Sequence, residues 1–206
     1  MAIPISELQG ISPSAKIELF VMELVEGTHY ATGNPSSVPT TFRFHAGTNM
    51  NTNAEIIWQG NTYQRFPITA EGFAFEGRGQ IPRPTLTMSN LGGITRSGQV
   101  ITVSDLIILV NLITPHNDLI NAKITRLLVL ASSLDAANFP GNNNPFGTPN
   151  SNELPQEIFF IDRKIAENHN TVQFELVSRL DQQNKKLPKR QVTRNEFPSV
   201  GSFINS

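Results

Sequence analysis

The sequence contains no cysteine, and this absence removes several kinds of chemistry at once. Without thiols the chain can form no disulfide, no zinc–thiolate site and no protein-ligated iron–sulfur cluster of the usual kind. A thiol nucleophile is excluded for the same reason. We therefore expect the protein to carry no cofactor.

Charge and long apolar runs are also scarce. Charged residues make up 16% of the chain and the formal net charge is −1, so the charge balance does not favour a nucleic acid or an anionic membrane as partner. No apolar run is longer than Leu106–Val110, which is far too short to span a bilayer. The opening residues lack the basic start and apolar centre of a signal peptide, so none is expected.

Apolar residues make up 38% of the 206 residues, which is enough to build a core in one generous domain. Asparagine is frequent, and it favours turns and left-handed backbone over long helices. The composition therefore predicts a mainly β (α+β) protein. We predict one domain over residues 1–180 and a basic, polar C-terminal extension over residues 181–206.

The segment Glu76–Asn90 has three possible interpretations: a phosphate loop, a proline docking motif or a β-strand. Its glycines lack the spacing of the dinucleotide fingerprint, and its prolines lack the P-x-x-P spacing of polyproline ligands. From Arg83 onward, apolar and polar residues alternate. We therefore predict a strand whose core face carries Pro84, Leu86 and Met88.

Alternation or apolar content predicts further strands along the chain. The predicted strands are Ala15–Leu24, Thr41–Ala46, Glu55–Gln59, Thr62–Phe75, Gln156–Lys164 and Thr171–Ser178. We expect Gly60 and Asn61 to form a hairpin turn. We expect the unbroken apolar centre of Gln156–Lys164 to be buried on both faces. The expected inward-facing residues elsewhere are Phe42, Phe44, Val172, Phe174 and Leu176.

The middle of the chain predicts one short helix. Thr102, Ser104 and Asp105 are candidate N-terminal caps, and Pro115 ends the run. Because the segment is apolar nearly all round, we expect it to be buried against the sheet or a partner. The next segment, 119–131, fits either a helix or a strand.

A long loop is predicted at residues 138–152, where asparagine, proline and glycine leave no periodicity. Because such a segment has little with which to build a core, we expect a neighbouring subunit to order it.

No catalytic, cofactor-binding or metal-binding residue is predicted. The four histidines have no metal-ligand spacing, and each is more typical of an ordinary turn or strand: His29, His45, His116 and His169. Glu71 and Glu76 would point to opposite faces of one strand, which gives no support for a glycosidase pair. We therefore predict that the protein is not an enzyme.

Two weaker patterns, a basic cluster and a set of aromatic residues, could each indicate a binding site or a purely structural role. A basic cluster could bind nucleic acid, but no aromatic residues lie between its members for base stacking: Lys185, Lys186, Lys189, Arg190 and Arg194. We interpret it as a solvated or subunit-contacting extension. Aromatic residues could form a sugar platform, although in alternating strands they are more typical of a core: Trp58, Phe66, Phe73 and Phe75.

Several stretches together resemble the minor tail protein L family of lambda-like, long-tailed bacteriophages. These are "FRFHAGTN", "IIWQGNTYQRFPITAEGFAFEGRGQIPRPTLTMSN", "KITRLLVLASSLDAANFP" and "EIFFIDRKIAENHNTVQFELVSRLDQQNKKLPKRQ". Their order and spacing also match the family, and the resemblance runs from about Lys16 to about Gln191.

The resemblance implies a structural virion protein at the tail tip. Such proteins form a ring between the distal tail ring and the central host-recognition protein, and help to nucleate the tail around the tape-measure protein. The implied fold is an antiparallel β-barrel or sandwich of the tail-hub type. The implied self-association is a homotrimer, with a hexamer possible. Neither a membrane nor a specific nucleic acid is an expected partner. The expected location is the tail tip, with host cytoplasm during assembly.

The C-terminal part departs from the family pattern. Family members commonly continue into a cysteine-bearing domain that holds an iron–sulfur cluster, whereas Val192 and Phe197 stand about where the first cysteines would fall. The sequence therefore looks like a shortened form without the cluster.

The alternative function is a carbohydrate-binding accessory module that uses Trp58, Tyr63 and the asparagine-rich loop.

Overall fold

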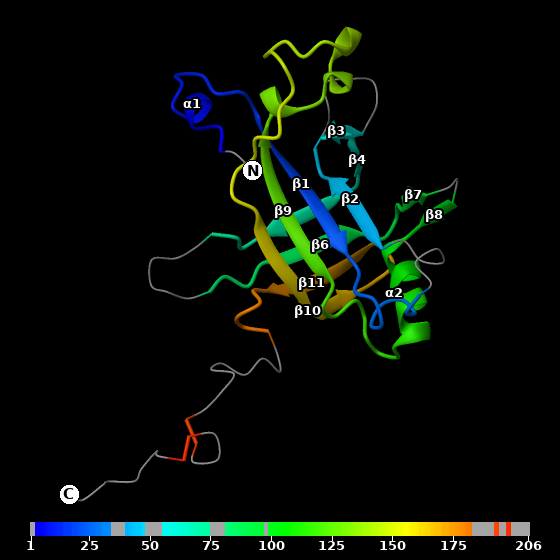
Figure 1. Ribbon diagram of the computed structural model, residues 1–206. Helices are drawn as coiled ribbons and strands as arrows, with labels where there is room; N and C mark the ends of the chain where they lie inside the picture. Colours follow the sequence, from blue (N-terminus) through cyan, green and yellow to red (C-terminus); the bar gives the residue numbers. More distant parts are fainter. Residues whose placement is uncertain are drawn as a thin grey trace, which may run out of the picture.

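The computed structural model describes residues 3–33, 40–47, 55–74, 81–96, 99–182, 192–193 and 197–198. Strands predominate in it (Figure 1). They are β1 (Lys16–Glu23), β2 (Thr41–His45), β3 (Ile56–Trp58), β4 (Asn61–Arg65), β5 (Ile68–Glu71), β6 (Thr85–Ser89), β7 (Ile94–Arg96), β8 (Gln99–Ile101), β9 (Lys123–Leu130), β10 (Glu157–Glu167) and β11 (Thr171–Val177). The helices are α1 (Ile5–Leu8) and α2 (Val103–Ile113), with 3-10 turns η1 (Ala131–Ser133), η2 (Ala136–Asn138) and η3 (Pro140–Asn142).

Nine strands form one sheet in the order β3-β4-β2-β1-β9-β10-β11-β6-β5, and β7 and β8 form a separate hairpin. This confirms the mainly β prediction. The sheet is mixed rather than wholly antiparallel, because β2 and β4 run parallel while the other neighbours are antiparallel. Among the described strands the ladder does not close into a ring, and β3 and β5 are its terminal strands.

One continuous segment joins two distant parts of this sheet. β4 pairs with β2 near one end and β5 pairs with β6 at the other, yet only Phe66 and Pro67 separate β4 from β5. The Phe66 amide donates to the His45 carbonyl at 2.9 Å, and the Ser89 amide donates to the Pro67 carbonyl at 2.9 Å. The prediction of one strand over Thr62–Phe75 is therefore wrong, because Pro67 lacks the amide that a continuing ladder needs. The sheet must curl to bring its two ends together.

The main core fills the inside of this curl. Phe20 and Phe44 stack with ring centroids 5.8 Å apart, and Phe66 meets Phe44 edge to face. In Figure 1, β6 and β11 cross behind β1 and β9, and α2 lies at the lower right. The buried face of α2 joins the same core, so the helix closes one end of the curl.

The strand predicted from Glu76–Asn90 is present as β6. Leu86 and Met88 are almost fully buried and Pro84 is buried, whereas Thr85 and Thr87 are half-buried. The predicted inward faces of β2 and β11 are confirmed too, with these residues in the main core: Phe42, Phe44, Val172, Phe174 and Leu176.

Helix α2 begins with a complete capping box. The Thr102 hydroxyl accepts from the Asp105 amide, and the Asp105 carboxylate accepts from the Thr102 amide at 3.0 Å. The expected burial of this helix against the sheet is confirmed for one face, which lies in the main core, whereas Ile108 and Leu112 on the other face are exposed. A helix that lies across one end of a sheet contacts it with one face only.

Two further strand predictions are decided by pairing. The ambiguous segment 119–131 forms β9, because Lys123–Leu130 pairs along its whole length with β1. The prediction that Gln156–Lys164 is buried on both faces is wrong. Phe159 lies in the core, whereas Ile158 faces outward and is exposed.

The β3–β4 hairpin turn is Gln59-Gly60 rather than Gly60-Asn61. Trp58 pairs with Asn61, and the two residues between them have φ of 51° and 70°. Both values lie in the left-handed region that two-residue hairpins with this twist require.

The long loop is tied to its own chain at its start. Phe139 is buried in a second core, and the Asn144 side chain donates to the carbonyls of Ser132 and Leu134, each at 3.0 Å. The expectation that a neighbour orders the whole loop therefore fails for residues 138–144. Residues 145–151 are exposed.

Asn138 protects the free edge of β3. Its side chain accepts from the Ile57 amide at 2.7 Å and donates to the Ile57 carbonyl at 2.5 Å, as a neighbouring strand would. A paired edge is closed to strand addition by another chain. The same amide group donates to the Asp135 carbonyl at 2.8 Å.

We expect Asn138→Asp to destabilise the fold by about 3 kcal/mol, since it places a buried carboxylate oxygen against two carbonyl oxygens. Urea unfolding measures this loss. The loss should shrink as the pH is lowered, because protonation restores one donor. Asn143→Asp, at an exposed position of the same loop, is the control. A variant as stable as the control at pH 7 would contradict the role of Asn138.

Candidate interaction surfaces

The described residues contain no cluster of three or more histidine, aspartate or glutamate side chains that could hold a metal ion. The histidines are not brought together. His29 follows β1, His45 ends β2, and His116 and His169 lie in exposed turns. Glu71 lies on β5, and Glu76 is outside the described residues.

His29 has a structural role. Its Nδ1 accepts from the Val25 amide at 2.8 Å, and its Nε2 lies 2.8 Å from the Ile120 carbonyl. Burial lowers the pKa of this imidazole, and the Ile120 carbonyl partly opposes the shift. The neutral ring therefore pins the turn after β1 to the segment before β9.

The proposed sugar platform is not displayed on the surface. Trp58 and Tyr63 are buried in the second core, and Phe66 and Phe73 are buried in the main core. Phe75 lies outside the described residues. So do all members of the basic cluster: Lys185, Lys186, Lys189, Arg190 and Arg194.

A charged cluster lies across β1, β9 and β10. The Arg126 guanidinium pairs with Glu18, and with Glu157 at 2.7 Å. The same group lies 4.4 Å from the centre of the Phe73 ring. Both carboxylates are paired with the same guanidinium, so this cluster joins the three strands.

The N-terminal segment exposes large apolar side chains. Helix α1 buries none of its residues, and Ile5 and Ile11 are 58% and 106% exposed. Glu7 anchors the segment, because its carboxylate accepts from the Ser132 hydroxyl at 2.5 Å and from the Ser14 amide at 3.2 Å. These hydrogen bonds lower the pKa of Glu7 against the opposing effect of burial.

The outer face of α2 forms a second apolar surface, which we name the α2 ridge. It consists of Ile108, Leu112 and Ile113, of which Leu112 is 76% exposed. Ile108 and Leu112 are four residues apart and so lie side by side along the helix.

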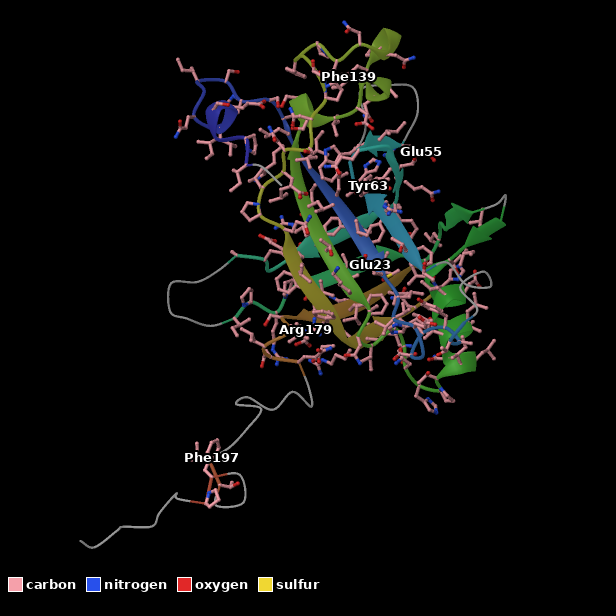
Figure 2. The ribbon with its side chains drawn as sticks, in the orientation of Figure 1. Glu23, Glu55, Tyr63, Phe139, Arg179 and Phe197 are labelled. Carbon is pink, nitrogen blue, oxygen red and sulfur yellow. The ribbon has the colours of Figure 1, made fainter. Side chains whose placement is uncertain are left out.

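A third surface is a hollow on the outside of the sheet, which we name the sheet groove. Its volume is about 820 Å³. It is lined by Glu23, Leu24, Val25, Tyr30, Thr40, Thr41, Lys123, Ile158, Phe160 and Arg179. Figure 2 shows Glu23 and Arg179 below Tyr63, and far from Phe139 at the top.

Residues 36–200 match the family described as phage minor tail protein L. The chain belongs to this family. It is also similar to the tail tip protein L of Escherichia phage lambda, with 35% identity over 94 residues. That match covers 46% of this chain and 34% of the lambda protein, so the chain spans about a third of its relative's length.

Membership of the minor tail protein L family makes the chain a phage tail component and a structural virion protein. None of the helices in the described part of this family member is long and apolar enough to cross a membrane. Two of its surface features, the N-terminal segment and the α2 ridge, expose large apolar side chains.

The sequence indicated one of these surfaces and missed another. The sequence indicated the α2 ridge, because the predicted helix has more apolar residues than one buried face can hold. The sheet groove was missed, because an apolar strand with one open face has the same composition as a strand buried on both.

Proposed function

We propose that this chain is a structural component of the phage tail tip. It forms a ring between the distal tail ring and the central host-recognition protein, and this ring nucleates tail assembly. Membership of the minor tail protein L family carries the proposal, together with the similarity to a protein named tail tip protein L. The protein would be present in host cytoplasm during assembly and at the tail tip afterwards.

The proposal includes its partners and its fold type. The ring consists of copies of this chain, a trimer first and a hexamer as the alternative. It contacts the distal tail protein, the central fibre and the tape-measure protein. The curled sheet with α2 across one end is consistent with a tail-hub fold related to tube barrels.

A carbohydrate-binding function has less support. Trp58 and Tyr63, the residues that a sugar platform would use, are 4% and 2% exposed. Aromatic rings that bind sugars must present a face to the ligand, and both rings are packed in a core instead.

Antibody labelling of intact phage tests the location. Negative-stain micrographs with an antibody to an exposed segment, such as residues 8–13, should show label at the end of the tail distal to the capsid. A phage carrying an epitope tag at residue 146 in the exposed loop would give an independent label. Label along the tube, on side fibres or on the capsid would contradict a tail-tip position.

A further inference from the structure

The α2 ridge and the sheet groove differ in shape. The ridge is convex, because its apolar residues project from the outer face of a helix whose other face is buried. The groove is concave, and its volume leaves room for several side chains. One molecule thus carries both a projecting apolar surface and a receiving groove, in which apolar side chains such as Ile158 and Phe160 lie beside charged ones.

The groove arises because the outer face of the sheet is only partly covered. Near Leu19 and Leu127 that face is covered by the second core, to which Trp58 and Phe139 contribute. Further along the same strands the second core no longer covers this face, and its residues are half-buried. The open cross-strand row consists of Thr41, Glu23, Lys123 and Phe160.

The charges of the two surfaces are complementary. In the groove, Lys123 pairs with Glu23 at 2.6 Å, and the exposed Arg179 lies 5.6 Å from the centre of the Phe160 ring. The groove therefore has one cation more than it has anions. The last turn of α2 carries no basic residue, so its carbonyl end is electronegative.

Both surfaces lie at the same end of the molecule. The turn that follows β1 lines the groove with Leu24 and Val25. The C-terminal end of α2 is attached to that turn, because the Thr114 hydroxyl donates to the Thr28 carbonyl at 2.7 Å. Figure 1 shows α2 at the lower right, and in the same orientation Figure 2 shows the groove residues Glu23 and Arg179 to its left.

We propose that the α2 ridge of one copy binds in the sheet groove of the next copy. Such a contact joins two different surfaces, and a contact of this type generates a ring when its rotation closes. Because the ridge and the groove lie at the same end of the molecule, successive copies can lie at the same height along the ring axis. A closed ring requires this. The inference rests on the proposed function for the existence of the ring, and it adds the surfaces that form it.

The cysteine-free sequence permits a cross-linking test without background. In a variant with Leu112→Cys and Ile158→Cys, one thiol lies on the ridge and one in the groove. A short bis-maleimide should join neighbouring copies into a ladder of dimers and larger species that ends at the ring size. Cross-linking should be roughly 100-fold faster than between free chains at about 10 μM, because contact holds the thiols at an effective concentration near 1 mM.

Three controls make the result specific. Leu112→Cys alone and Ile158→Cys alone should give only slow, concentration-dependent dimers. Replacing the groove thiol by Ile11→Cys, at a fully exposed position of the N-terminal segment, should also remove the ladder. Circular dichroism should show that every variant keeps the fold of the wild type.

The outcomes separate this inference from the proposed function. A double variant that cross-links no faster than the Ile11 control overturns the ridge–groove contact. A ladder that stops at the dimer would show a two-fold contact instead and would overturn it as well. Antibody label at the tail tip with no ladder would retain the proposed location and reject this interface.

Discussion

A phage lacking this gene should produce filled capsids without tails. In the proposed role the protein is part of the tip complex on which the tail tube begins to polymerise. Without that complex the tube subunits have no starting ring. Electron micrographs of the deletion lysate measure the effect, which should be close to complete loss of tailed particles. Supplying the wild-type gene on a plasmid should restore tails.

Other functions would give a different deletion phenotype. A sugar-binding accessory protein would leave complete tails that adsorb weakly, and a wall-degrading enzyme would leave complete tails that penetrate poorly. Tails of normal length with an intact tip in the deletion lysate would therefore refute the nucleating role. Family membership would remain, since the match over residues 36–200 does not depend on that role.

The Leu86→Asp substitution should destabilise the fold by at least several kcal/mol. Leu86 is 0% exposed in the middle of β6, where it pairs with Phe174 on one side and Ala70 on the other. An aspartate there would bury a charge without a partner in the main core. Soluble yield and the thermal unfolding midpoint measure the loss.

Thr87→Asp is the matched control on the same strand. Thr87 faces the other side of the sheet, where it pairs with Gln173 and Thr69 and is half-buried. Thr85 is less suitable, because its paired residues are Glu175 and Glu71 and a third carboxylate would add repulsion. Equal stability of Leu86→Asp and wild type would contradict the burial of Leu86.

Local alternation predicted the faces of several strands from sequence. In β2, β6 and β11 every second residue is apolar, so the period of two identifies the inward side chains without knowledge of the neighbours. The cap of α2 was also predictable, because Thr102 and Asp105 have the spacing of a capping box. Such signals act within a few residues.

Long-range pairing was not predictable in the same way. The segment 119–131 has a helical period as well as β-branched residues, and only its pairing with β1 decides the outcome. The partner change at Phe66-Pro67 depends on two strands from elsewhere in the chain. The edge protection by Asn138 is similar, since an asparagine in a loop gives no sign of which backbone it will bind.

The pairing of β1 with β9 affects how the chain can fold. Lys16 pairs with Leu130 and Glu23 pairs with Lys123, so the paired residues of these two strands are about half of the chain apart. Loop closure over such a distance gives a high contact order, which slows folding. The hairpin of β10 and β11 and the capped helix α2 need only nearby residues, so they can form early.

During translation, β1 and β2 are synthesised well before β9, the strand that pairs with β1. At about 5–20 residues per second, β1 and β2 wait on the order of ten seconds for β9 to be synthesised. Throughout that interval Phe20, Phe42 and Phe44 lack the core that later buries them. The nascent chain is therefore exposed to aggregation before it can assemble with anything else. An ample supply of chaperones during this interval should favour the native chain.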